Sequence, residues 1–203
     1  MARKNGSPAA ANRTVPRRKP NGASRTREHL NENEVNTLLQ AAKGNRHGHR
    51  DYAMVLVCYR HGLRAQELCD LEWSQIDLDR ATMHISRVKQ GKPATHPIRG
   101  DVLRALRQLK REQSPASNFV FTSERGAPMK AVSFNMLVKR LGNGSKLLGL
   151  PLHAHMLRHA CGYALINAGI DVRVVQDYLG HKSIASTVRY TELSANKFKD
   201  VWR

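Results

Sequence analysis

The chain has 203 residues, 40% of them hydrophobic, and a formal net charge of +18. This length suits one catalytic domain with its own core, and the apolar content excludes a chain that is disordered throughout. The longest apolar run, residues 52–59, is too short to span a bilayer, and no apolar segment of a secretory signal follows the basic N-terminus. The charge favours an anionic partner, most commonly nucleic acid, although ribosomal and membrane-surface proteins share such a composition.

The cysteines are Cys58, Cys69 and Cys161, an odd number without a CxxC pair. Largely apolar residues flank Cys58 and Cys161. These features predict buried, reduced thiols in a cytoplasmic protein.

Residues 1–29 are predicted to form a disordered basic arm, because they hold eight Lys/Arg, one acidic residue and three prolines. The arm either follows DNA phosphates or is a solvated tail without a role. Its candidate DNA-binding residues are Arg17, Arg18, Lys19, Arg25 and Arg27.

The folded part is predicted to begin with a helix over residues 31–43. Asn31 is its expected N-cap, Glu34 completes a capping box, and Leu30 and Val35 form a hydrophobic staple. A second helix spans residues 50–60 and ends at Gly62, and a short third helix spans residues 64–70. Arg64 is therefore expected at a helix N-terminus, with Glu67 one turn further on the same face.

Residues 81–88 and 92–98 predict a β-hairpin with Lys89 at its tip, and Met83 and Ile85 on one face. Asp101 is the expected cap of a helix that runs to about residue 112, and residues 119–121 are predicted to form a short strand or an extended piece. Further helices are predicted over residues 131–141, 152–168, 171–179, 183–190 and 194–202. The predicted fold class is mostly α with a small antiparallel β-hairpin, an α+β domain over residues 30–203.

The helix of residues 152–168 carries three histidines and an arginine. His155 and Arg158 share a face, and His159 borders it. A cation beside an imidazole suits an anionic, oxygen-rich ligand. A zinc site that includes His153 is disfavoured, because the glutamate of an HExxH motif is missing and Arg158 lies in the middle of the set.

Exchange of a phosphodiester bond without a metal needs two guanidiniums for the charge on the transition state, a nucleophile and a general acid. A tyrosine nucleophile also needs nearby cations that favour the phenolate. Candidates for these tasks occur in separate parts of the chain: Arg64, Lys89, His155, Arg158, His181 and Tyr190. Their spacing alone does not establish that they converge.

In the order GLRAQEL, a hairpin-tip lysine, HMLRH, LGH and TVRY, these motifs closely resemble the tyrosine recombinases, the phage integrase family. The resemblance covers residues 30–203 and is strongest to the short recombinases that invert fimbrial phase-switch DNA. It implies a DNA recombinase that forms a 3′-phosphotyrosyl intermediate and uses neither a metal nor a nucleotide cofactor.

The resemblance also implies a role for each motif residue. Arg64 and Arg158 clamp the scissile phosphate, and Glu67 orients Arg64. Lys89 protonates the leaving oxygen, and Tyr190 is the nucleophile. His155 serves in proton transfer and phosphate binding, and His181 hydrogen-bonds the phosphate. His159 receives no such role and is interpreted as packing.

Many members of the family carry a separate N-terminal domain that closes around DNA, and this chain has only the basic arm before residue 30. The resemblance implies double-stranded DNA as the partner, a tetramer on two DNA sites and, as an open possibility, accessory DNA-bending proteins on the nucleoid. The tail of residues 194–203, with Phe198, Val201 and Trp202 as anchors, docks on a neighbouring protomer or on its own domain.

Two other functions compete with recombination. A DNA-binding regulator of recombinase descent would have no need for Tyr190 and Lys89 at their motif positions. A general RNA-binding protein accounts for the charge but not for the ordered motifs, and the few aromatic residues argue against stacking on single strands. Inversion, excision and integration are not distinguished by the sequence.

Overall fold

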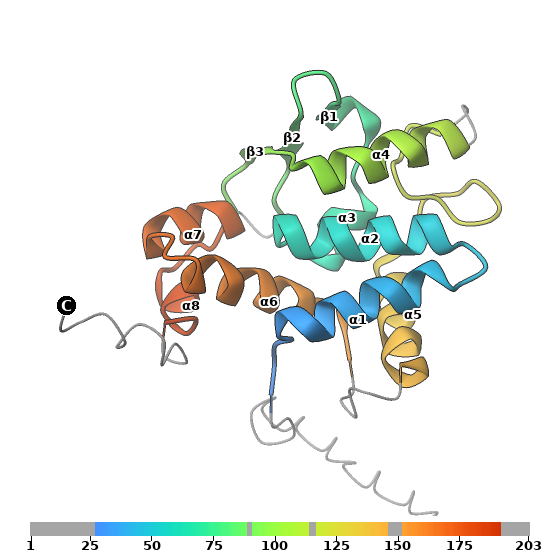
Figure 1. Cartoon of the computed structure of the whole chain (residues 1–203). Coiled ribbons are helices and arrows are strands. Elements are labelled where there is room, and N and C mark those ends of the chain that lie inside the picture. Colours follow the sequence, from blue (N-terminus) through green and yellow to red (C-terminus); the bar gives the residue numbers. More distant parts are fainter. Residues whose placement is uncertain (1–26, 89–90, 114–116, 146–151, 192–203) are drawn as a thin grey trace, which may run out of the picture.

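Helix α2 (Gly48–His61) runs through the middle of the fold, because it is apolar on nearly every side. All residues from Ala53 to Tyr59 are buried, as expected for a helix surrounded by other elements. Helices α1 (Glu32–Lys43) and α6 (Ala154–Asn167) pack on one side of it, and α4 (Gly100–Glu112) packs on the other (Figure 1). The structure is a computed structural model that describes residues 27–88, 91–113, 117–145 and 152–191.

The predicted class, mostly α with a small antiparallel sheet, is confirmed. Of the predicted helices, the one over residues 194–202 lies outside the described residues. The other elements are α3 (Ala65–Cys69), the 3-10 helix η2 (Trp73–Gln75), β1 (Ile76–Asp77), β2 (Thr82–Ile85), β3 (Ala94–Pro97), α5 (Ala131–Gly144), α7 (Val172–Leu179) and α8 (Ala185–Val188).

The predicted start of α1 and end of α2 are confirmed. The Asn31 side chain accepts a hydrogen bond from the backbone N–H of Glu34 at 2.9 Å, and the Glu34 carboxylate accepts one from the backbone N–H of Asn31 at 2.8 Å. Gly62 ends α2 in the left-handed conformation, with φ of 58°. The turn at Gly62 leads directly into α3, so it fixes where the first site arginine, Arg64, lies.

The three strands form an antiparallel sheet in the order β1-β2-β3. Met83 and Ile85 are buried on the predicted inner face of β2, and Met83 pairs with His96 of β3. The strands are shorter than predicted, and β1 was not foreseen because two residues carry no periodic pattern. The hairpin tip at residues 89–90 lies outside the described residues.

The prediction that Asp101 caps α4 is wrong. The cap position is Arg99, and Asp101 lies within the first turn of the helix. Its carboxylate pairs instead with Arg60 of α2 at 2.9 Å, a tertiary contact that local helix-start rules do not consider. The segment of residues 119–121 forms a single bridge, from Phe119 to Glu72, and not a strand.

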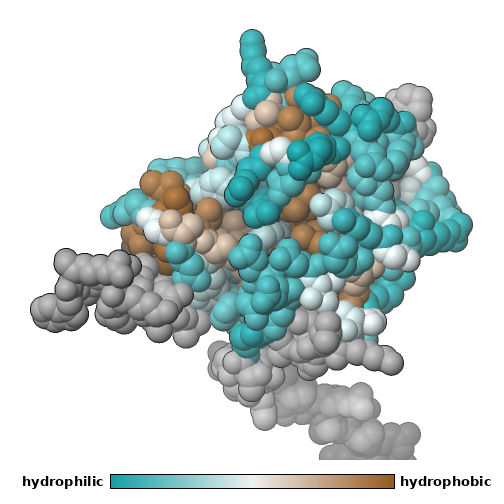
Figure 2. All heavy atoms as spheres, in the orientation of Figure 1, coloured by the Kyte–Doolittle hydropathy of each residue, from teal (hydrophilic) through white to brown (hydrophobic). Residues whose placement is uncertain are grey.

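The visible face of the molecule is mostly hydrophilic, with apolar side chains gathered over its α7–α8 end (Figure 2). Large apolar residues exposed in this part of the chain are Ile170, Val174 and Val188. Among the helices that the structure describes, none is both long and apolar enough to cross a membrane.

Replacing Gly62 by alanine should destabilise the fold for two reasons that can be separated. A Cβ at Gly62 would lie 2.3 Å from Leu179 Cδ2, in addition to the left-handed strain. Gly169 has φ of 81° and nothing within 4 Å of its Cβ position, so Gly169→Ala is a control for strain alone. In urea unfolding we expect a loss of about 1–2 kcal/mol for Gly169→Ala and roughly 2–5 kcal/mol for Gly62→Ala. Equal losses would contradict the close contact with Leu179.

Candidate active site

The carboxylate of Glu67 organises the arginines of the site. Arg64 is the N-cap residue of α3, and its backbone N–H donates to Glu67 Oε2 at 2.9 Å. The Arg64 guanidinium also donates to Glu67 Oε1 at 2.6 Å. The Glu67 side chain is fully buried, whereas that of Arg64 is 25% exposed. Glu67 therefore holds a guanidinium that still reaches solvent, and the two residues lie one turn apart, as the sequence predicted.

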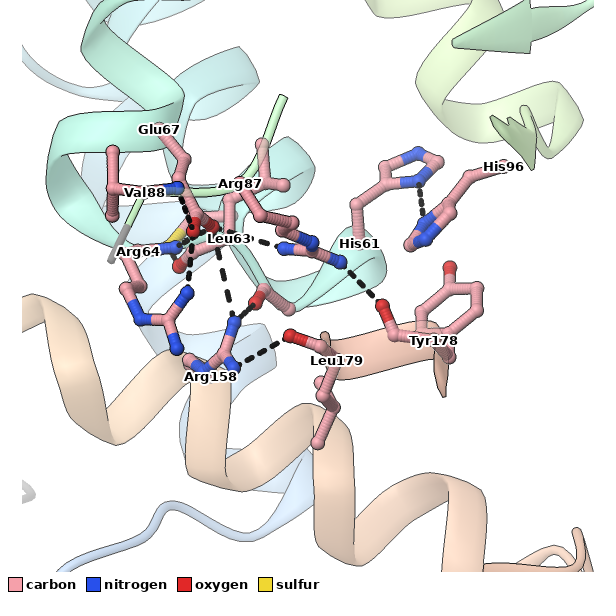
Figure 3. A network of polar contacts seen from close by, with 12 residues as sticks. His61, Leu63, Arg64, Glu67, Arg87, Val88, His96, Arg158, Tyr178 and Leu179 are labelled. Atoms are coloured by element: carbon pink, nitrogen blue, oxygen red, sulfur yellow. Dashed lines mark hydrogen bonds and ion pairs between the residues drawn. The ribbon is translucent and has the colours of Figure 1, made fainter. Parts of the chain in front are cut away.

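A second arginine, Arg87, binds the same carboxylate from the end of β2. Its Nη1 lies 2.9 Å from Glu67 Oε2, and its Nη2 donates to the backbone carbonyl of Tyr178 (Figure 3). The sequence interpretation gave Arg87 no role. The alternation of β2 could have found it, because Arg87 continues the inner-face positions of Met83 and Ile85.

Arg158 joins the cluster from α6. Its guanidinium donates to the carbonyls of Gly62 at 2.5 Å and Leu179 at 2.6 Å, and lies 3.9 Å from Glu67 Oε2 (Figure 3). These carbonyls end α2 and α7, where helix dipoles favour a cation. Arg158 is 1% exposed. The two arginines predicted to clamp a phosphate thus meet at one carboxylate.

The cluster holds more positive than negative charge. Burial would raise the pKa of the Glu67 carboxyl, but the Arg64 backbone N–H and the Arg87 guanidinium outweigh it, and the pKa is lowered. Burial, followed by Arg64 and Arg87, lowers the pKa of Arg158 to about 10. One carboxylate therefore faces three guanidiniums within the described residues. An anionic group would relieve their mutual repulsion.

Tyr190 follows α8 and its side chain is fully buried against α6. Its hydroxyl lies 2.9 Å from Nδ1 of His159. The ring of His181 stacks on the Tyr190 ring with centroids 6.1 Å apart, and His181 Nδ1 lies 2.8 Å from the Thr187 hydroxyl. The interpretation of His159 as packing is therefore incomplete, because this residue contacts the predicted nucleophile directly. The contact is made across 31 residues, and no local pattern encodes it.

The imidazoles of this group are neutral near pH 7. Partial loss of solvent, followed by the charge of Arg158, lowers the pKa of His155 to about 4 and the pKa of His181 to about 3. Burial, followed by His155, lowers the pKa of His159 to about 2. The expectation that nearby cations favour the phenolate of Tyr190 is not met: burial outweighs Arg158 and Arg189 and raises its pKa to about 12.

The remaining predicted residues divide into two groups. Arg27 pairs with Glu34, and the two residues after it also contact the folded domain. Glu28 pairs with Arg189 at 2.8 Å, and the His29 ring packs at a tilt against Tyr163, with centroids 4.0 Å apart. The others lie outside the described residues: Arg17, Arg18, Lys19, Arg25 and Lys89. In the described ranges no group of three or more His, Cys, Asp or Glu is arranged to hold a metal ion.

Motifs far apart in the sequence thus meet around Arg158 and His159 of α6, an arrangement that fits the catalytic domain of a tyrosine recombinase. Residues 28–197 match the model of the phage integrase family. The type 1 fimbriae regulatory protein FimB of Escherichia coli strain K12 is 40% identical over 88% of this chain and 91% of its own length. FimE of the same strain is 36% identical over 87% and 91%. The chain belongs to the phage integrase family.

Solved structures agree with this assignment. The crystal structure of XerA recombinase superposes with a TM-score of 0.73 at 27% identity, over 83% of this chain. The tyrosine recombinase XerA of Pyrococcus furiosus is 29% identical over 84% of this chain. This chain spans about three fifths of the XerA chain, 61% in the structural comparison and 59% in the sequence comparison.

Acid should unfold this protein through three histidines that are buried without charge. Burial is the main cause that lowers the pKa of His61 to about 4, His96 to about 3 and His159 to about 2. The unfolded chain binds protons near pH 6.5, so the stabilisation is complete above that pH and is lost as the pH falls towards the folded values. Each proton contributes about 1.4 kcal/mol per pH unit, so we expect the free energy of unfolding to fall by several kcal/mol between pH 6.5 and 4.5.

His96→Phe should make this pH dependence shallower by about one proton, because His96 is buried without charge. Proton uptake on unfolding, measured by calorimetry in buffers of different ionisation enthalpy, gives the number directly. Equal uptake by wild type and His96→Phe would show that His96 is not a neutral buried group.

Proposed function

We propose that this protein is a site-specific DNA recombinase that breaks and rejoins duplex DNA through a covalent phosphotyrosyl intermediate. The observation that carries the proposal is the shared carboxylate of Glu67, which brings Arg64 and Arg158 together although they lie in motifs more than ninety residues apart. The excess of positive charge at this point suits a phosphodiester. The Tn1549 transposon integrase, which shares this fold, was solved in complex with transposon right end DNA, and a lambda integrase dimer was solved bound to a core site, which supports DNA as the partner.

In the proposed reaction, Arg64 and Arg158 hold the non-bridging oxygens of the scissile phosphate and offset the charge that develops there. Glu67 keeps the Arg64 guanidinium in place through two hydrogen bonds. Arg87 occupies the second oxygen of Glu67 and so prevents that carboxylate from turning away. Arg87 acts as a positioning residue.

Tyr190 attacks the phosphorus, and its oxygen forms the new bond as the bond to the 5′-oxygen breaks. Lys89 gives a proton to this leaving oxygen, which makes Lys89 the general acid. His155 and His181 are neutral, so each can donate one N–H to the phosphate or pass a proton. The bond energy stays in the phosphotyrosyl ester, so rejoining needs no ATP. The two guanidiniums take the place that a metal would have in offsetting the transition-state charge.

The type of exchange proposed is DNA inversion. Its support is the similarity to FimB and FimE, which extends over 91% of the length of each. The alternative, a regulator of recombinase descent that binds without cutting, leaves the buried contact between His159 and Tyr190 unexplained.

Assembly on DNA is proposed as a homotetramer, with accessory DNA-bending proteins as further partners on the nucleoid in the cytoplasm. The exposed apolar side chains at the α7–α8 end suit a contact between protomers. The tail of residues 194–203 would add to such a contact by docking in trans, with docking on its own domain as the alternative. The three thiols are free and buried, which fits a reducing compartment.

Covalent trapping tests the reaction. Purified protein is incubated with a nicked suicide duplex from its native locus, denatured, and examined for a DNA–protein adduct. Wild type and the matched control Tyr52→Phe should form the adduct, and Tyr190→Phe should form none because it lacks the attacking oxygen. Duplex binding without any adduct in the wild type would reject the catalytic function and support the regulator.

The arm is proposed to bind phosphates without reading sequence. Replacing Arg17, Arg18, Lys19 and Arg25 by alanine should lower the slope of log affinity against log salt by up to about 3–4, since each phosphate contact contributes about 0.9. Adduct formation at saturating DNA should be unchanged. An unaltered slope, measured by fluorescence anisotropy with labelled duplex, would make the arm a tail without a role in binding.

A further inference from the structure

The hydroxyl of Tyr190 faces the residue that follows Arg158 in the chain. His159 Nδ1 lies 2.9 Å from the phenolic oxygen, with His159 4% exposed and Tyr190 fully buried. Arg158 donates to two helix-end carbonyls beside Glu67, and His159 contacts the predicted nucleophile. These two residues are consecutive in α6. Consecutive residues of α6 therefore connect Arg158, part of the predicted phosphate clamp, to the predicted nucleophile, which His159 contacts.

The ring of Tyr190 lies directly on the backbone of α6 at Gly162. A Cβ at Gly162 would be 2.5 Å from Tyr190 Cε2 and 2.7 Å from Cζ, so this position accepts no side chain while the ring is docked. Tyr163 meets the ring edge-on at 5.0 Å, and His181 covers it at 6.1 Å. With its ring held on these sides, Tyr190 keeps its hydroxyl at His159.

The charge states of His159 and Tyr190 leave one proton, that of the phenol, for the hydrogen bond between them. His159 is neutral because burial, His155 and nearby arginines oppose its protonation. Tyr190 keeps its phenolic proton because burial opposes the phenolate. The imidazole can therefore present a lone pair at Nδ1 to the O–H of Tyr190. A phosphodiester held by Arg158 would offset the positive charge of the nearby arginines. It would thereby make His159 a better proton acceptor.

We propose that His159 is a further catalytic residue, whose Nδ1 accepts the phenolic proton as Tyr190 attacks the scissile phosphorus. The inference rests on the proposed function. The bond from the phenolic oxygen to phosphorus forms, the bond from phosphorus to the 5′-oxygen breaks, and Lys89 protonates that oxygen. His159 becomes an imidazolium. In rejoining, the 5′-hydroxyl attacks the phosphotyrosine, the bond to the phenolic oxygen breaks, and His159 returns its proton to that oxygen.

Two substitutions separate proton transfer from hydrogen bonding. His159→Ala removes both, whereas His159→Asn keeps an amide oxygen that accepts a hydrogen bond but is not basic. The matched control is His61→Asn, which makes the same change at a similarly buried histidine whose side-chain partner is His96 and not Tyr190. Thermal unfolding and duplex binding are measured for all three, so that a folding defect is recognised.

The readout is the rate of adduct formation on the native-locus suicide duplex, with either oxygen or sulfur as the bridging atom at the 5′ position. A thiolate leaves without a proton, so sulfur should restore the rate of Lys89→Ala. Both His159 variants should be slower than wild type by roughly 100-fold or more on either duplex, because the lost step occurs at the nucleophile. His61→Asn should react at the wild-type rate.

Three results would overturn the assignment of His159. These are a folded His159→Asn that reacts as fast as wild type, a rate restored by sulfur, and an equal loss in His61→Asn. The asparagine variant decides if the alanine variant does not fold, since it keeps the buried hydroxyl paired. Absence of the wild-type adduct would reject the recombinase function itself, and the proposal for His159 with it.

Discussion

One buried carboxylate, that of Glu67, holds the site together. It joins α3, the end of β2 and α6 through guanidiniums at 2.6, 2.9 and 3.9 Å. Breaking a buried ion pair of this kind leaves charge without compensation and typically costs about 3–5 kcal/mol. Three cations share this one carboxylate, so the cluster is short of negative charge. A phosphate has the charge and the oxygen atoms to complete it.

The same region depends on how two helices end. The carbonyls of Gly62 and Leu179 accept hydrogen bonds from Arg158, and left-handed glycines follow α2 and α7. Gly180 also leaves room for Arg87, whose Nε would lie 2.8 Å from a Cβ at that position. Helix termination, usually a matter of local backbone geometry, here supplies part of the binding site for two guanidiniums.

Local features of the fold were predictable, and tertiary contacts were not. The capping box of Asn31 and the glycine after α2 follow from a few neighbouring residues, and both are confirmed. Asp101 was misjudged because Arg60, distant in sequence, competes for its carboxylate. The motif residues Arg64 and Arg158 were identified by their order, but their meeting at Glu67 required the structure. Arg87 could have been found from strand alternation, and the contact of His159 with Tyr190 could not.

The structure separates two chemical environments that act on one reaction. Around Glu67 the side chains are charged and cationic, whereas around Tyr190 the imidazoles and the phenol are neutral. Arg158 and His159 lie at the boundary, in the same turn of α6. A phosphate that enters the cationic side reduces the field that keeps His159 neutral, and so favours release of the phenolic proton. Under the proposed mechanism, binding of the scissile phosphate and activation of Tyr190 are then steps of one event.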